Sequence, residues 1–155
     1  MSRTTFHRRP LGLALFVLAL VPTARAAAQD RAPTASAAVE QFIRAASDSN
    51  LTRMAQLFGT DKGSVQQTGK PEDYPKRMVV IQAMMGGTAV RALNEVVTAR
   101  KNHVVVTTEV AKGNCKVVVP VTAVKADGGW LVREFDLPAI WDGINRPCAG
   151  ERPGN

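Results

Sequence analysis

The hydrophobic pattern changes its period once along this chain, and that change constrains the possible folds more than any other feature. From residue 36 to residue 85, apolar residues recur at the spacing of amphipathic helices. From residue 90 to residue 135, runs rich in Val and Thr alternate with short turn segments, which is typical of strands. This order predicts an α+β fold, with about three N-terminal helices packed on a curved four-stranded antiparallel meander.

The first two helices are expected to form a hairpin. The apolar stripe of the first helix comprises Val39, Phe42, Ile43 and Ala46. Ser36 is its expected N-cap. The second helix, at 51–58, follows the capping residues Ser49 and Asn50 and ends before Gly59.

A polar loop and a third helix complete the helical half. The loop spans 60–71, and a short edge strand is expected within it near 64–66. The third helix is expected at 72–85, with Glu72 and Asp73 in its first turn, where the helix dipole favours acids. Two consecutive glycines then end it.

The strand half reads as a series of hairpins. The four strands are expected at 90–97, 104–110, 116–124 and 130–135. Turn residues separate them at 100–102, 112–114 and 127–129. Pro120 lies inside the third strand and has no N–H to donate, so a bulge or a sheet edge is expected there.

Residues 1–28 have the composition of a secretory signal peptide. Arginines precede an apolar run from Leu11 to Val21, and small residues follow, so cleavage is expected after Ala26 or Ala28, with Ala28 favoured. An uncleaved membrane anchor is the alternative. Eleven apolar residues form a helix of about 16 Å, which is too short for a hydrocarbon core of about 30 Å. The mature protein is therefore expected in the periplasm or outside the cell, without a membrane span.

Cleavage of the signal peptide would change the net charge. The precursor carries +7, but four of its 20 Lys and Arg residues and none of its 13 acids precede residue 29, which leaves +3. A modest charge with interspersed signs is not typical of a nucleic-acid-binding surface, so no nucleic-acid partner is expected. The remaining chain divides into a disordered lead-in at 29–35, one domain at 36–141 and a C-terminal tail at 142–155.

The two cysteines, Cys115 and Cys148, both lie in the exported part. In an oxidising compartment they are expected to form a disulfide that tethers the tail to the domain. A zinc site would need four ligands, and a catalytic thiol would depend on His103 as its base. Two unpaired, inert thiols are the remaining alternative. No metal and no cofactor are expected.

Two sequence motifs carry a resemblance to a known fold. The helical hairpin of Ala38–Ala46 and Leu51–Phe58 opens the region, and Asp127-Gly128-Gly129-Trp130-Leu131-Val132 closes it. Together they resemble the NTF2-like superfamily, and most of all its small exported branch. The resemblance covers residues 36 to 136 and implies a cystatin-like cone with a pocket between the helices and the concave sheet. No catalytic motif of this superfamily matches, so no catalytic residue is assigned.

Candidate pocket residues follow from side-chain alternation along the strands. Thr108 faces inward if the neighbouring valines do, and Asn94 does so in the preceding strand. In the last strand one register places Glu134 in the pocket and the other places Arg133 there. Tyr74, at the start of the third helix, is a further candidate as a proton donor.

Two aromatic residues outside this set have structural expectations. His103 is expected to be exposed beside a turn, at the start of the second strand. Trp141 is expected to pack the tail against the domain.

These observations lead to one hypothesis and two alternatives. The leading hypothesis is an exported non-catalytic NTF2-like module that binds a small apolar ligand or forms a homodimer through its sheet face. The first alternative is an enzyme of the ketosteroid isomerase or SnoaL kind, an isomerase, cyclase or hydratase, which would use Tyr74 with Arg133 or Glu134. The second is a purely structural or interaction protein.

Overall fold

The computed structural model describes residues 31–145 and residue 148. Its helices are α1 (Ala35–Ser47), α2 (Leu51–Leu57), α3 (Val65–Thr68), α4 (Tyr74–Met85) and α5 (Leu137–Asn145). Its strands are β1 (Gly59–Thr60), β2 (Gly63–Ser64), β3 (Ala89–Val97), β4 (His103–Lys112), β5 (Cys115–Ala126) and β6 (Gly129–Phe135). The signal peptide, its cleavage after Ala26 or Ala28, and residues 29–30 and 149–155 lie outside the described residues. No helix in the described ranges is long and apolar enough to cross a membrane.

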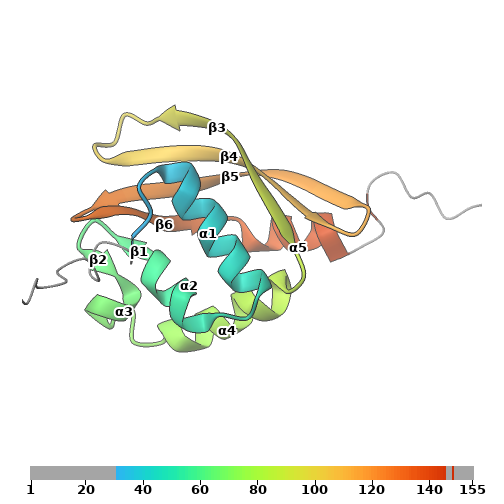
Figure 1. The fold of residues 1–155 in the computed structure, drawn as a ribbon, viewed down its shortest axis with the longest axis horizontal. Coiled ribbons are helices and arrows are strands. Elements are labelled where there is room, and N and C mark those ends of the chain that lie inside the picture. The colour runs from blue at the N-terminus through green and yellow to red at the C-terminus, as the bar shows by residue number, and fades with distance from the viewer. Residues whose placement is uncertain (1–30, 146–147, 149–155) are drawn as a thin grey trace, which may run out of the picture.

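Strands β3 to β6 form the predicted antiparallel meander, in the order β3-β4-β5-β6. The turn residues Asn102 and Gly113 adopt the left-handed backbone conformation, with φ of 62° and 58°. Figure 1 shows α1, α2 and α4 together on one side of the curved sheet. The α+β arrangement is therefore confirmed. The helix order differs from the prediction, since the short α3 lies between the second and third predicted helices.

Helix α1 begins slightly earlier than predicted, because Thr34 and not Ser36 is its N-cap. The Thr34 hydroxyl accepts a hydrogen bond from the Ala37 N–H at 3.1 Å. The Ser36 N–H instead donates to Glu95 Oε1 on β3, at 2.8 Å. A carboxylate from the sheet thus satisfies an otherwise unpaired N–H at the positive end of the helix dipole.

Residues 31–35, expected as part of a disordered lead-in, belong to the fold. Ala32 is fully buried and pairs with Trp130, whose N–H donates to the Ala32 carbonyl at 2.8 Å. This pairing explains the glycine before the tryptophan. A Cβ on Gly129 would lie 2.6 Å from the Ala32 carbonyl oxygen, and its φ of 151° is one that other residues rarely adopt.

The loop after α2 differs from the prediction. Its residues form the β1–β2 hairpin and then α3, so the edge strand expected at 64–66 ends at Ser64. The physical reason is a capping box, in which Ser64 and Gln67 each bond the other's backbone N–H and start a helix. At α4, Asp73 is the N-cap residue and Glu72 precedes it, so neither acid lies in the first turn.

A helix that the sequence analysis did not predict, α5, follows β6 directly. It buries Ile140 and Ile144, which are 0% and 3% exposed, against the same core as α1. Trp141, which was expected to pack the tail, is only partly buried and lies outside this core. Apolar residues four apart therefore continue the packed structure through residue 145.

The core lies between the helices and one face of the sheet. All four residues of the predicted α1 stripe are at most 2% exposed. They pack with Met54 and Leu57 of α2, with Met78 and Met85 of α4, and with alternate residues of β4 and β5. Between α1 and the sheet, the space is filled by buried side chains, among them Phe42.

Two β-bulges interrupt the side-chain alternation on which the pocket candidates were chosen. In β3, Ala92 pairs with Thr108 and Asn94 pairs with Thr107, which leaves Leu93 as the extra residue. In β6, Val132 and Glu134 pair with consecutive residues of β5, so Arg133 is extra. Beyond each bulge, the residues that face the core change parity.

Pro120 lies at an edge position, as predicted. It pairs with Thr107 of β4 on one side of β5. On the other side, the ladder with β6 ends where Phe135 pairs with Val121, the residue directly after Pro120 in β5. The missing N–H of proline is therefore tolerated where β5 has no partner from β6.

Candidate functional site

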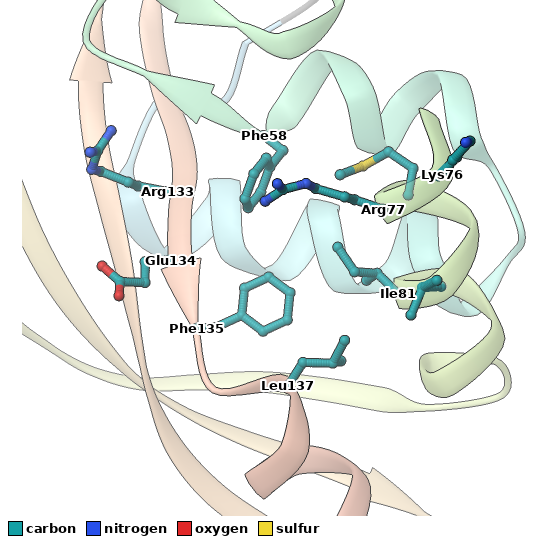
Figure 2. Close-up of a pocket in the computed structure, with 10 residues that line it drawn as sticks. Phe58, Lys76, Arg77, Ile81, Arg133, Glu134, Phe135 and Leu137 are labelled. Atoms are coloured by element: carbon teal, nitrogen blue, oxygen red, sulfur yellow. The ribbon is translucent and has the colours of Figure 1, made fainter. Parts of the chain in front are cut away.

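An apolar cleft of about 430 Å³ lies between α4, the end of β6 and the start of α5. Six of the residues that line it are hydrophobic: Phe58, Met78, Val80, Ile81, Phe135 and Leu137. Figure 2 shows Phe58, Phe135 and Leu137 on the side opposite the α4 residues. The volume is in the range of pockets that bind small molecules, and a few polar groups beside an apolar wall are typical of such sites.

Three phenylalanines from three elements form the floor of the cleft. The Phe42 ring of α1 lies 5.6 Å from the Phe58 ring and 5.7 Å from the Phe135 ring, measured between centroids. Phe58 and Phe135 meet edge to face, with their centroids 6.4 Å apart. Phe42 is fully buried, whereas Phe58 and Phe135 are partly exposed and offer aromatic surface to an occupant.

Local structure explains why these rings meet. Phe58 directly follows α2 and forms a parallel bridge with Val132 of β6, which holds it beside the sheet. Phe135 reaches the core side because the extra residue Arg133 changes the parity of β6, so that Phe135 pairs with inward-facing Val121. Without the bulge, Val132 and Phe135 could not both face the helices.

Four charged residues border the cleft: Lys76, Arg77, Arg133 and Glu134. The Arg77 Nε donates to Asp73 Oδ2 at 2.9 Å, an i,i+4 pair within α4. Figure 2 shows the Arg77 side chain extending from α4 towards Phe58, across the cleft. The charged ends of Arg133 and Glu134 lie on the other side of β6 from the Phe135 ring.

Each of the two registers considered for the last strand holds for only part of β6. Trp130 and Val132 pack on the core side as the first register requires, but Phe135 does so as the second requires. Glu134 pairs with Thr122 on the opposite face and is exposed. Arg133 and Glu134 both border the cleft, but their charged ends point away from the Phe135 ring (Figure 2).

The other three pocket candidates do not line the cleft. Thr108 faces the core as predicted and is fully buried, but its hydroxyl donates to the Val106 carbonyl at 3.1 Å. Asn94 is exposed and pairs with outward-facing Thr107, since the bulge at Leu93 changes its face. Tyr74 is partly buried and packs against the core cluster. Of the five predicted pocket residues, Arg133 and Glu134 therefore border this cleft, and the other three lie elsewhere.

The prediction that His103 is exposed is wrong. It is only 7% exposed, and its Nδ1 lies 2.8 Å from the Lys101 carbonyl oxygen. It pairs with Val124, which is also buried, so the side chain lies along the sheet instead of pointing out from the turn.

Most of the residues that line the cleft were not predicted from the sequence. Lys76, Arg77 and Val80 lie on the predicted third helix, but their role depends on which face of α4 borders β6 and α5. One signal was available in the sequence. Lys76 and Val80, like Arg77 and Ile81, are four residues apart, so cations stand directly beside apolar residues on the helix surface.

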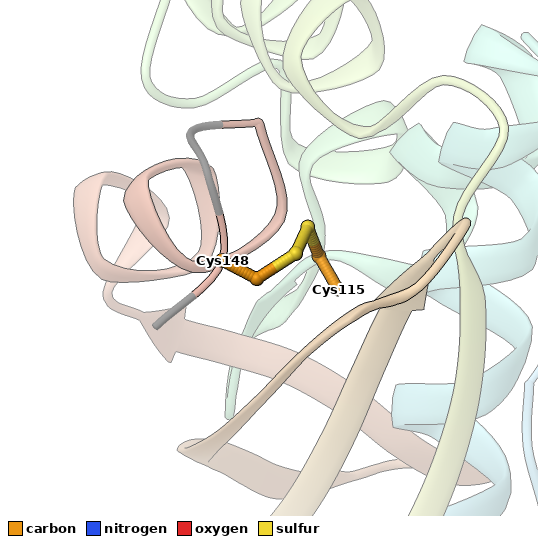
Figure 3. Close-up of a disulfide and its surroundings, with 2 residues drawn as sticks. All are labelled: Cys115 and Cys148. Atoms are coloured by element: carbon orange, nitrogen blue, oxygen red, sulfur yellow. A yellow bond between two sulfur atoms is a disulfide. The ribbon is translucent and has the colours of Figure 1, made fainter. Parts of the chain in front are cut away.

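The two cysteines lie at the opposite end of α5 from Leu137. The structure joins Cys115, at the start of β5, to Cys148 in a disulfide with a Cα–Cα distance of 5.2 Å (Figure 3). This is the pairing expected from the sequence. Nearby, Lys112 Nζ donates to Asn145 Oδ1 at 3.0 Å, which adds a contact between β4 and the last residue of α5.

Comparisons with known proteins give no function. No family model matches the chain, and no curated protein matches it. Among solved structures, an NTF2-like protein of unknown function from Cytophaga hutchinsonii is 12% identical, covers 68% of this chain and 92% of its own, and has a TM-score of 0.40. A protein of unknown function with a cystatin-like fold from Nostoc punctiforme is 12% identical, with coverages of 67% and 94% and a TM-score of 0.42.

A third solved structure is an LEH-like epoxide hydrolase from M. tuberculosis. It is 18% identical, with coverages of 71% and 88% and a TM-score of 0.34. At these identities and TM-scores we take nothing about function from the likeness. NTF2-like and cystatin-like proteins are thus among the solved structures similar to this chain, which is the superfamily that its sequence resembles.

Proposed function

We propose that this protein is an exported binding module that holds a small apolar ligand in the cleft between α4, β6 and α5. The observation that carries the proposal is the floor of the cleft, where the partly exposed Phe58 and Phe135 rings stand on the buried ring of Phe42. An apolar ligand would remove this aromatic surface from water, which is favourable in proportion to the area covered.

The cleft geometry supports binding over the enzymatic alternative. An isomerase or hydratase would need an acid and a base that converge on one substrate atom. Arg133 and Glu134 border the cleft, but Tyr74, the predicted proton donor, does not line it, so the acid and the base proposed from the sequence do not both border the cleft.

Self-association through the sheet face has weaker support. Val96 and Val118 on that face are 51% and 53% exposed. Beside Val118, however, Glu109 of β4 forms an ion pair with Arg91 at 3.3 Å, and Lys116 lies 4.0 Å from the same carboxylate. Charged residues are depleted at the core of protein interfaces, so we favour the cleft as the functional surface.

The proposal of export rests on the sequence of residues 1–28 and on the cysteine pair. Disulfides persist in oxidising compartments such as the periplasm and the extracellular medium. The Cys115–Cys148 pair is compatible with such a location. Intact mass of the protein recovered from the periplasm checks cleavage after Ala26 or Ala28, and a full-length mass there contradicts it.

A pair of tryptophan variants tests ligand binding. Val80 lines the cleft and is 54% exposed, so Val80→Trp should fill part of the cleft without disturbing the core. We expect it to weaken binding of the neutral fluorescent probe N-phenyl-1-naphthylamine at least tenfold, since the probe and the indole would compete for the same surface.

The adjacent residue provides the matched control. Val79 is 48% exposed on the same helix but does not line the cleft, so Val79→Trp should leave the probe affinity within about twofold of the wild type. Thermal unfolding of both variants checks that the fold is intact. If the probe does not bind the wild type, or if both tryptophans weaken it equally, the cleft is not the binding site.

A further inference from the structure

The rim of the cleft carries positive charge above an apolar floor, and this contrast defines the class of ligand. We propose that the ligand is an amphipathic monoanion, an apolar body with one carboxylate, whose charged end is held by Arg77. The inference rests on the proposed function, because it concerns the occupant of the same cleft.

Arg77 has hydrogen-bonding capacity that the described part of the chain does not use. Its Nε donates to Asp73, and no contact of its two terminal amino groups is recorded among the described residues. Its side chain is 59% exposed and extends across the cleft towards Phe58 (Figure 2). A planar guanidinium with two available terminal amino groups is well suited to bind a carboxylate.

The charges around the mouth favour an anion. Lys76 and Arg77 border the cleft from α4, and Asp73 neutralises one of these two charges. Arg133 and Glu134 on the opposite wall carry opposite signs, and both point away from the Phe135 ring. One net positive charge therefore remains on the α4 side, which suits a single negative charge on the ligand.

The residues below Arg77 determine how polar the rest of the ligand can be. Below Arg77, the lining is formed by Phe58, Ile81, Phe135 and Leu137. These residues offer no side-chain hydrogen-bond donor or acceptor, so a second polar group on the ligand would be buried without a partner. Dianions and highly hydroxylated molecules are therefore disfavoured relative to a simple apolar acid.

Three probes of equal chain length and different charge test the inference: decanoate, decan-1-ol and decyltrimethylammonium. We expect the wild-type protein to bind decanoate about fivefold more tightly than decanol, as an exposed ion pair allows, and decyltrimethylammonium most weakly. The preference for decanoate should decrease as ionic strength rises from 0.05 M to 0.5 M, because salt screens the exposed charges.

Two arginine variants test whether Arg77 provides the positive charge that binds decanoate. Arg77→Gln should reduce the affinity for decanoate to that for decanol, while the affinity for decanol stays within about twofold of the wild type. Arg91→Gln removes the same charge from β3, where Arg91 pairs with Glu109 and is 67% exposed, and should leave the preference for decanoate unchanged. Thermal unfolding of both variants checks that neither has lost its fold.

The outcomes separate this inference from the function on which it rests. Equal binding of decanoate and decanol to the wild type, or tightest binding of the cation, overturns the anion assignment and leaves an apolar binding cleft. A preference for decanoate that survives in Arg77→Gln overturns the role of Arg77. If none of the three probes binds and N-phenyl-1-naphthylamine does not bind either, the proposed function itself fails.

Discussion

At the scale of single residues, one helix side chain contacts the sheet where the sheet departs from regular alternation. This side chain is Glu40 of α1, whose Oε1 accepts a hydrogen bond from the Ala92 N–H at 3.0 Å, next to the bulge at Leu93. Its other oxygen, Oε2, forms an i,i+4 ion pair with Arg44 at 3.4 Å. The carboxylate thus satisfies a backbone donor at the point where the β3–β4 register shifts.

Removing this carboxylate should be more costly than removing its ion pair. We expect Glu40→Ala to lower the free energy of unfolding by about 1–2 kcal/mol, because a partly buried backbone N–H loses its acceptor. Arg44→Ala should cost about 0.5 kcal/mol or less, since that side chain is 65% exposed. Urea unfolding measures both. Equal effects would mean that the bond to Ala92 contributes nothing beyond the surface pair.

At the scale of elements, α5 is the part whose position most affects the cleft. Its first residue, Leu137, lines the cleft, while Ile140 and Ile144 anchor the helix in the core. The helix approaches β5 so closely at Gly143 that a Cβ there would lie 2.5 Å from the Cβ of Val117. Glycine is required here by the distance between α5 and β5.

Helix propensity and packing make opposite predictions for Gly143→Ala. Alanine should favour the helix by about 1 kcal/mol, but the clash involves a Val117 Cβ that cannot rotate away. We expect packing to dominate, with a net loss of about 1–2 kcal/mol in the free energy of unfolding.

The double variant separates the two effects. Val117→Ala removes the branched methyl groups, which lie 2.8 Å and 3.0 Å from the added Cβ, but not the Val117 Cβ itself. In that background Gly143→Ala should still be destabilising, because the 2.5 Å contact with the Cβ of residue 117 remains, but less so than in the wild type. A double-mutant cycle in urea would report the difference as a coupling energy, and a coupling near zero would show that the two Val117 methyl groups do not contribute to the clash.

At the scale of the whole molecule, the disulfide closes the structure at the end of α5 away from the cleft. It joins residues 33 positions apart, from the start of β5 to Cys148 after α5. Such a loop closure restricts the unfolded chain more than it changes the folded one. The packing of Ile140 and Ile144 should therefore hold α5 in place even when the bond is absent.

Replacing both cysteines by serine tests whether the disulfide contributes to stability without affecting the cleft. Cys115→Ser with Cys148→Ser should lower the free energy of unfolding by about 2–4 kcal/mol. The affinity for N-phenyl-1-naphthylamine, measured well below the unfolding temperature, should stay within about threefold of the wild type. A large loss of affinity in a variant that is still folded would show that the disulfide positions the wall formed by Leu137.

Much of the fold could be predicted from local patterns. The stripe of α1, the caps and ends of α2, the glycines after α4 and the order of the four strands all follow from spacing and turn composition. These features depend on residues within a few positions of one another. Helix α5 was not predicted because it is only nine residues long and contains Gly143, and its apolar residues become a buried face only against Val117 and the core.

The site, in contrast, was decided by the tertiary structure. Leu93 and Arg133 are extra residues in their strands, and no local pattern distinguishes them, yet they place Asn94 outside the core and Phe135 inside it. The Phe42, Phe58 and Phe135 rings meet only because α1, the end of α2 and β6 converge. The sequence by itself determined the elements and their order, since these depend on neighbouring residues. Only packing between distant segments could decide which side chains line the cleft.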